Sequence, residues 1–268
     1  MKTLPACWMR MTLACIAGLA AASAVAADRW AQLAYEPVAL AWTAHEVESA
    51  TAGNFEAIVR RARGEGQYGC EKSCERVRRV FERLVPLARA QTARARQLPW
   101  TLTVVRTQGV EALALPGGQV MISEAFIHEH KMPDAQLAFV LAHEMAHSIL
   151  EHERQTLHFA RMLLRQDVPR SVADMYVEIG YNFALLSSLE PVMQQGELEA
   201  DELGLLLASA AGYAPREQLG FMAQQAALGK SPNPLVRTHP AARERLVQLR
   251  ARLPLAQRLY TAQQVRRR

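Results

Sequence analysis

Residues 137–150 have the sequence LAFVLAHEMAHSIL, an apolar run that contains the pattern His-Glu-x-x-His. Apolar residues occupy nearly every face of this stretch, which predicts a buried helix. Pro133 and Asp134 precede it and favour a helix start, because proline fits the first turn and an acidic side chain complements the helix dipole. A helix advances about 100° per residue, so His143 and His147 lie one turn apart on the same face.

Two histidines placed in this way can bind one metal ion, at about 2.0–2.1 Å for zinc. Glu144 lies beside them, where its carboxylate can take a proton from a water molecule that the metal activates. Chance alone produces the pattern in roughly one chain in a hundred, and the alternative is a histidine pair satisfied within the core. Burial favours the metal, because buried histidines and carboxylates are costly unless paired or metal-bound. We therefore predict a metal site on His143 and His147, with Glu144 as general base.

A third ligand is predicted on a second helix, 50 residues after His147. Glu197 and Asp201 are four residues apart and share one helical face, whereas Glu199 points about 200° away from Glu197 and is expected not to serve the same centre. An acidic pair on a helix more often belongs to a solvated face, but the apolar stretch 205–211 that follows indicates burial. We predict Glu197 as the third ligand, with Asp201 holding a ligand histidine in its tautomer.

The chain resembles the gluzincin metallopeptidases that include HtpX, the CAAX prenyl proteases and the periplasmic BepA-type proteins (peptidase family M-48). The resemblance spans roughly residues 75–255 and rests on four segments in order: ALALPGG at 112–118, HEMAH at 143–147, ExxxD at 197–201, and Thr238-His239-Pro240 with Arg245 six residues after the histidine. It implies one Zn²⁺ per chain, held by His143, His147 and Glu197, with Glu144 as the base.

The resemblance also places His239 near the metal, where it could stabilise an oxyanion or occupy the open coordination position. Taken alone, the Thr-His-Pro tripeptide more often marks a helix start, with Thr238 as its cap. The hypothesis is that His239 is a catalytic group that can also hold the enzyme latent until substrate displaces it. Arg245 is expected to pair with a carboxylate of the site.

Helical periodicity and breaker residues predict helices at 30–63, 71–97, 216–228 and 238–253, and more than one helix within 154–194. Strands are predicted at 101–106, 112–115 and 119–122. We therefore expect an α+β, mainly helical, zincin-like fold with a small β-sheet beside the HExxH helix. The strand with Ala112, Leu113 and Ala114 is expected to be an edge that binds an extended substrate through its main chain, which gives broad specificity.

The first residues are typical of a secretory signal peptide, because Lys2 and Arg10 accompany an apolar stretch that ends in small residues near Ala27. We expect a signal peptide at 1–27 and a periplasmic location, with a lipoprotein anchored through Cys15 as the alternative. The remaining chain is expected to form one metallopeptidase domain, with N-terminal helices at 28–98, a catalytic core at 99–255 and a tail at 256–268. No segment reaches the roughly 20 apolar residues that a membrane span needs.

Removal of such a leader leaves two cysteines, Cys70 and Cys74. In an oxidising compartment they are expected to form a disulfide, because one helical turn separates Cα atoms by about 6 Å. A metal-binding pair is the alternative, which the lack of a neighbouring histidine disfavours.

The net charge of +5 is spread along helices in which arginines alternate with acids, as in 60–96. No groove-reading motif accompanies these arginines, so nucleic acid is not expected as a partner. The tail at 266–268 is expected to be solvated, with peripheral contact to an anionic membrane as the alternative. The expected function is that of a zinc endopeptidase acting on unfolded or misassembled periplasmic proteins. A chaperone-like protein that keeps zinc without cutting, and an amidase acting on cell-wall peptides, are the alternatives.

Overall fold

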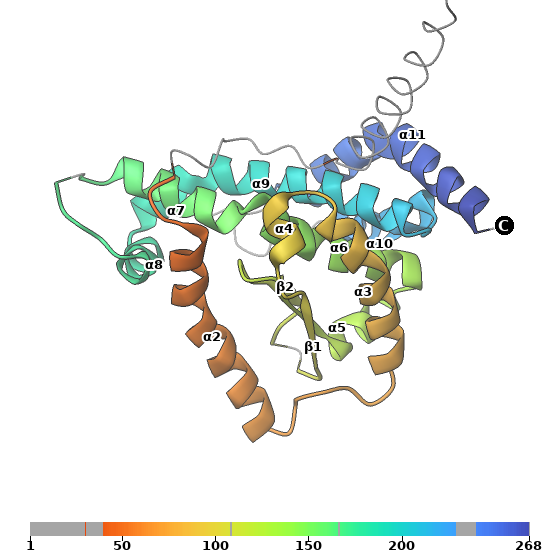
Figure 1. Ribbon diagram of the computed structural model, residues 1–268, viewed down its shortest axis with the longest axis horizontal. Coiled ribbons are helices and arrows are strands. Elements are labelled where there is room, and N and C mark those ends of the chain that lie inside the picture. The colour runs from red at the N-terminus through yellow and green to blue at the C-terminus, as the bar shows by residue number, and fades with distance from the viewer. Residues whose placement is uncertain (1–29, 31–39, 108, 166, 229–239, 268) are drawn as a thin grey trace, which may run out of the picture.

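The structure is a computed structural model that describes residues 30, 40–107, 109–165, 167–228 and 240–267. The predicted signal peptide, Cys15 and His239 lie outside these residues. Helices dominate the described part and surround one small sheet, as Figure 1 shows, so the predicted α+β, mainly helical class is confirmed. None of the helices described combines the length and the apolar character that a membrane crossing requires.

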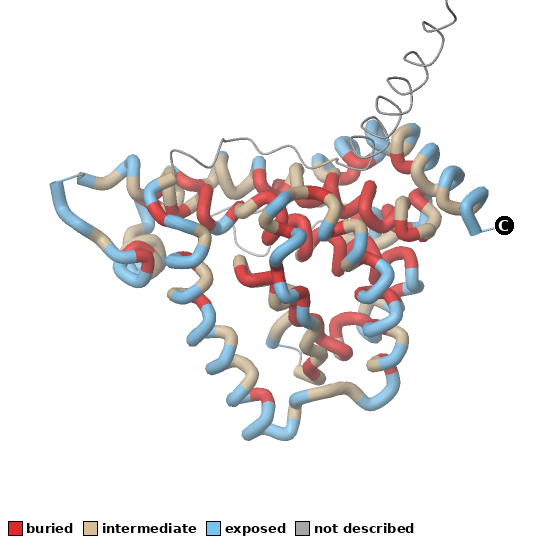
Figure 2. The backbone as a smooth tube through the Cα atoms, in the orientation of Figure 1, coloured by how far each residue is buried: buried red, intermediate tan, exposed pale blue. Residues whose placement is uncertain are grey.

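Two helices form the centre of the molecule, α6 (Asp134–Leu150) and α9 (Phe183–Ala210). Almost every residue of α6 is buried, which follows from its apolar residues on all faces. The helices α3 (Cys74–Arg89), α10 (Pro215–Leu228) and α11 (Ala242–Arg266) pack around this pair. Figure 2 shows that burial is concentrated along these central elements, whereas the outer faces of the surrounding helices are exposed.

The sheet has three strands in the order β1-β3-β2, which are β1 (Thr101–Val105), β2 (Ala112–Ala114) and β3 (Gln119–Ser123). β1 pairs with β3 in parallel, and β2 pairs with β3 antiparallel. Gly118 takes a φ of 80° in the turn between β2 and β3, a conformation that favours glycine. In the part of the chain that the structure describes, β2 is therefore an edge strand.

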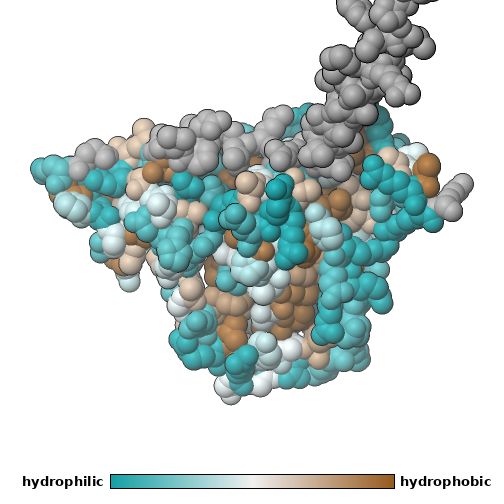
Figure 3. Space-filling view, in the orientation of Figure 1, coloured by the Kyte–Doolittle hydropathy of each residue, from teal (hydrophilic) through white to brown (hydrophobic). Residues whose placement is uncertain are grey.

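A second apolar cluster joins α2 (Ala44–Gly64), α7 (His152–Leu163) and α8 (Val172–Tyr181) to the first half of α9. Its buried members include Val47, Leu157, Met175 and Leu189. Figure 3, in the orientation of Figure 1, shows apolar side chains gathered at the middle of the visible face, between the hydrophilic surfaces of α2 and α3. The partly buried apolar residues of the sheet are Leu102, Val104, Ala112, Leu113 and Ala114.

Two predicted helix boundaries near the N-terminus are wrong. The helix expected at 30–63 begins at Ala44, because Thr43 and Glu46 form a capping box in which each side chain accepts the other residue's backbone N–H. The helix expected at 71–97 is divided by a turn at 90–92 into α3 and α4 (Ala93–Gln97), and the Thr92 side chain caps α4.

The boundaries of the last helix also differ from the prediction. α11 begins at Ala242 rather than at 238, and it continues to Arg266 beyond the predicted end at 253. Leu255 and Leu259 pack against the core, which keeps the chain helical where a tail was expected. Arg267 is exposed, as expected of a solvated end, and it also donates a hydrogen bond of 2.8 Å to the carbonyl of Ala211.

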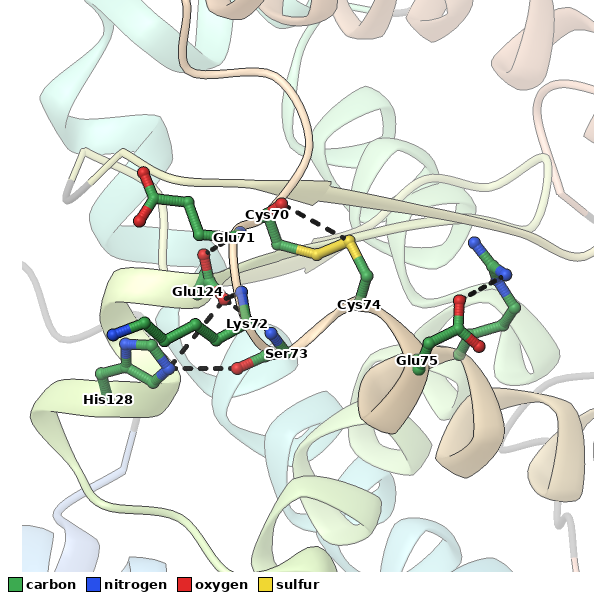
Figure 4. Close-up of a disulfide and its surroundings, with 9 residues drawn as sticks. Cys70, Glu71, Lys72, Ser73, Cys74, Glu75, Glu124 and His128 are labelled. Atoms are coloured by element: carbon green, nitrogen blue, oxygen red, sulfur yellow. Dashed lines mark hydrogen bonds and ion pairs between the residues drawn. A yellow bond between two sulfur atoms is a disulfide. The ribbon is translucent and has the colours of Figure 1, made fainter.

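Cys70 and Cys74 are joined by a disulfide, with Cα atoms 5.6 Å apart, next to the start of α3 (Figure 4). The loop between them is held by Glu124, the first residue of α5 (Glu124–Glu129), a short helix that the sequence analysis did not predict. The Glu124 carboxylate accepts the backbone N–H groups of residues 71–73 at 2.7, 2.9 and 2.8 Å. Burial acts to raise the pKa of Glu124, but these hydrogen bonds outweigh it and the pKa lies below its ordinary value.

Candidate metal centre

Three ligand atoms meet between α6 and α9. The Nε2 atoms of His143 and His147 are 3.1 Å apart. Carboxylate oxygens of Glu197 lie 3.6 Å from Nε2 of His143 and 3.4 Å from Nε2 of His147. Ligand atoms held at about 2.0–2.1 Å from one tetrahedral ion are about 3.3 Å from each other. The triangle therefore fits a single ion with these residues as ligands.

A close helix crossing brings Glu197 to the histidines. A Cβ atom added at Gly204 would lie only 2.9 Å from the backbone nitrogen of His143, so glycine permits α9 to approach α6 at this point. Glu197 precedes Gly204 by seven residues, about two helical turns, and so lies on the same face of α9. The crossing thus directs the Glu197 carboxylate toward the two imidazoles.

Asp201 and Arg245 lie directly behind the ligands. Oδ1 of Asp201 is 3.1 Å from Nδ1 of His143, and the Asp201 residue is 1% exposed. Two N–H groups of Arg245 on α11 donate to the Asp201 carboxylate, both at 2.7 Å, and a third nitrogen lies 3.0 Å from Glu197. The carboxylate orients His143, since a histidine ligand needs its second nitrogen fixed to keep one tautomer.

The charges of the site act differently on its two histidines. Burial lowers the pKa of His147 well below its ordinary value, and the neighbouring His143 and His152 add to this effect. For His143 burial also acts to lower the pKa, but the hydrogen bond that it donates to Asp201 and the charge of Glu197 raise it above the ordinary value. His147 is thus held neutral, the form in which an imidazole binds a metal.

Glu144 lies on α6 between the two histidines and faces a cavity of about 310 Å³. Burial and the charge of Glu197 raise the pKa of its carboxyl group, which moves its basicity toward neutral pH. The backbone N–H of Ala114 in β2 donates to the same carboxylate. The general base is therefore linked to the edge strand.

The cavity lies between the sheet and the helices α2, α4, α6, α7 and α9. Residues 112–116 form one wall, and the other walls include apolar side chains of α2 and α9, such as Val47, Val192 and Met193, and polar side chains of α7. The hydroxyl of Ser148 donates to the carbonyl of Leu115 at 2.8 Å, which fixes the end of β2 to the ligand helix. The outer edge of β2 thus runs along the ligand cluster.

His152 is a site residue that the sequence analysis missed. Its Nδ1 is 2.9 Å from Nδ1 of His147, and its Nε2 is 3.3 Å from Oε2 of Glu199. Glu199 lies outside the ligand triangle, as expected, but His152 connects it to a ligand. In one continuous helix His152 would point about 140° away from His147. Only the break between α6 and α7 at Glu151, which has a φ of 57°, brings the two rings together.

A buried HExxH helix, crossed by a second helix that supplies a glutamate ligand, defines a metallopeptidase domain of the gluzincin class. Comparison with known proteins agrees with this class. Residues 71–253 match the model of peptidase family M48, and the chain belongs to this family.

Similar proteins include the mitochondrial metalloendopeptidase OMA1 of Schizosaccharomyces pombe, 30% identical over 185 residues that make up 68% of this chain and 53% of that protein. The human OMA1 metalloendopeptidase is 30% identical over 178 residues, 60% of this chain and 33% of that protein. The β-barrel assembly-enhancing protease of Escherichia coli is 25% identical over 170 residues, 58% and 34% of the two chains. The chain spans about half the length of these relatives, or less.

Proposed function

We propose that this protein is a zinc-dependent endopeptidase that hydrolyses peptide bonds of unfolded or misassembled proteins in the periplasm. One observation carries the proposal. A single cavity is bordered by the ligand triangle of His143, His147 and Glu197, by the Glu144 carboxylate and by the outer edge of β2. A binding site for metal alone requires neither a half-buried carboxylate between the ligands nor the edge strand that the described residues place beside them.

Each step of the proposed reaction is assigned to particular residues of the chain. When bound, zinc would supply the Lewis acid that activates water and polarises the scissile carbonyl. The edge of β2 binds the substrate backbone as a neighbouring strand and positions the peptide bond beside Glu144. Glu144 takes a proton from the attacking water and passes it to the leaving amine nitrogen. Asp201 keeps Nδ1 of His143 protonated, so that Nε2 stays directed at the ligand cluster.

The substrate class and the location follow from different features. Main-chain recognition by β2 requires an extended segment, which an unfolded protein exposes and a folded one does not. The signal-peptide-like residues 1–27 and the disulfide between Cys70 and Cys74 support an oxidising compartment. Unfolded protein chains are therefore the proposed partners, and the periplasm is the proposed place of action.

The proposed reaction is tested with the Glu144→Gln variant. The purified, zinc-loaded protein and the variant are compared for cleavage of reduced, carboxymethylated casein, after equal zinc content has been measured. We expect the parent to cleave and the variant to be slower by about 10²–10⁴-fold, because glutamine cannot accept the proton. Equal rates would exclude Glu144 as the base. Zinc binding without cleavage by either protein would favour the chaperone-like alternative, and cleavage of cell-wall peptides alone would favour the amidase.

The role of His239 remains a proposal, since this residue lies outside the part of the chain that the structure describes. If it holds the enzyme latent, His239→Ala increases basal cleavage and weakens zinc binding. Unchanged activity and unchanged zinc affinity would contradict the latent state.

A further inference from the structure

The left-handed residue Glu151 places a histidine where helical geometry alone would not. Its φ of 57° ends α6, and α7 begins with His152. A non-glycine residue in this conformation costs about 1 kcal/mol or more, so the neighbouring structure has to hold it. Both carboxylate oxygens of Glu151 are in ion pairs, with Arg94 at 2.8 Å and with Arg154 at 2.8 Å. The break therefore fixes the position of His152 beside His147.

The hydrogen-bond chain behind His147 allows one assignment of protons. Nε2 of His147 faces His143 and Glu197, so its lone pair is directed at the ligand cluster and Nδ1 carries the proton. That N–H donates to Nδ1 of His152 at 2.9 Å. His152 then carries its own proton on Nε2, which donates to Oε2 of Glu199 at 3.3 Å. The amide of Gln195 donates to the other oxygen of Glu199 at 2.8 Å, which orients the carboxylate.

Gly196 provides the space that the His152 ring occupies. A Cβ atom added at this position would lie 3.3 Å from Cγ of His152, which is tighter than most such contacts, and 3.4 Å from its Nδ1. His152 is 8% exposed, so its ring has little room to move aside. Glycine at 196, immediately before the ligand Glu197, thus keeps Nδ1 of His152 aligned with His147.

We propose that His152 and Glu199 are positioning residues that fix the tautomer and the orientation of His147, as Asp201 does for His143. The inference rests on the proposed function only in taking His147 as a metal ligand. Each ligand histidine then has a carboxylate behind it. Asp201 contacts His143 directly, and Glu199 reaches His147 through the imidazole of His152. The proposal assigns a role to three residues outside the ligand triangle, namely Gly196, His152 and Glu199.

The test measures zinc affinity by competition with a chromophoric chelator, which requires no peptide cleavage. His152→Phe keeps a ring of similar size but removes the acceptor, and we expect zinc to bind about 10–100-fold more weakly. His152→Asn places an amide oxygen near the position of Nδ1 and is expected to recover most of the affinity. Co²⁺ bound to the Phe variant should also show an altered visible spectrum, because the His147 ring is free to turn. Glu202→Gln, on the exposed side of α9, is the matched control and should leave both readouts unchanged.

Further variants keep the proposal open to contradiction if His152→Phe does not fold. Gly196→Ala and Glu199→Leu should weaken zinc binding in the same range as His152→Phe, with circular dichroism confirming the fold of each variant. Unchanged zinc affinity and Co²⁺ spectrum in folded variants would overturn the proposal, as would equal losses for the Phe and Asn variants. Tight zinc binding without cleavage by the parent protein would remove the proposed function and leave the role of His152 intact.

Discussion

Arg245 is a buried charge held between two carboxylates. Its side chain is 13% exposed and contacts both Asp201 and Glu197. Burial acts to lower its pKa, but the hydrogen bond and charge of Asp201 raise it, so the guanidinium stays charged. Removing one partner from such a cluster leaves the other charges buried without compensation. We predict that Arg245→Ala lowers the free energy of unfolding by about 3–5 kcal/mol, as measured by urea denaturation of the zinc-free protein.

The ion pair between Arg252 and Glu202 provides the control for this prediction. It joins the same two helices, α11 and α9, but its side chains are 53% and 38% exposed. Arg252→Ala should therefore change the free energy of unfolding by about 1 kcal/mol at most. Equal effects of the two substitutions would show that burial of Arg245 does not matter.

Among the site residues, those within one regular helix were accessible from the sequence. The four-residue spacings of His143 with His147 and of Glu197 with Asp201 show which side chains share a helical face, independently of the tertiary structure. His152 was not accessible in this way, because its direction depends on the backbone of Glu151, which a local ion pair with Arg154 and a tertiary one with Arg94 hold. The link of Glu199 to the centre was not accessible either, because it passes through His152.

The crossing of α6 and α9 depends on the missing side chain of Gly204. We predict that Gly204→Ala destabilises the protein by about 1–3 kcal/mol, because the added Cβ would lie 2.9 Å from the backbone nitrogen of His143 and force the helices apart. Zinc affinity should fall in parallel, since Glu197 moves with α9 and His143 with α6. Chemical denaturation and chelator competition measure the two effects.

Gly53 in α2 is the matched control for this change, because a Cβ atom there would meet no atom within 4 Å. Gly53→Ala should be neutral or stabilising by up to about 1 kcal/mol, as expected for glycine in an exposed helix. A destabilisation similar to that of Gly204→Ala would indicate that the helix crossing is not the cause.

The contact between α5 and the disulfide loop makes stability depend on pH. The pKa of Glu124 in the folded protein lies below the ordinary value of 4.5. Its ionised carboxylate therefore adds stability that is fully present above about pH 4.5 and is lost as pH falls through the folded pKa. Glu124→Gln should destabilise the protein by about 1–3 kcal/mol at neutral pH, because an amide cannot accept all three N–H groups.

Urea midpoints at about pH 6 and about pH 3 check this prediction. The difference between the two midpoints should be smaller in the Glu124→Gln variant than in the parent. The same difference in both proteins would mean that other carboxylates account for the pH dependence.

At the scale of elements, the strands were predicted almost to the residue, since alternation and the Pro-Gly-Gly turn are local signals. Helix ends were less predictable. The start of α2 depends on the reciprocal cap of Thr43 and Glu46, and the division between α3 and α4 depends on Thr92, both of which a long helical periodicity conceals. The extension of α11 follows from the packing of Leu255 and Leu259 on the core, a contact that periodicity alone does not reveal.

For the whole molecule, zinc should act as a link between its two apolar clusters. The ligands come from α6 and α9, and α9 continues from the main core into the cluster around Leu157 and Met175. A ligand that binds only the folded state stabilises it, by about 2.7 kcal/mol when its free concentration is 100 times Kd. We predict that the melting temperature rises with free zinc and returns to the zinc-free value with a chelator. His147→Ala should show no such rise in calorimetry, and a rise equal to that of the parent would place the ion elsewhere.

The order of the site residues along the chain also bears on how the protein is made. His143 and Glu144 leave the ribosome well before Glu197, and Arg245 follows almost 50 residues after that. A partly synthesised chain therefore holds the HExxH helix without its third ligand, and then a pair of carboxylates without the guanidinium that neutralises them. A copy truncated before Glu197 therefore lacks a complete ligand set, and one truncated before Arg245 leaves the two carboxylates without their cation.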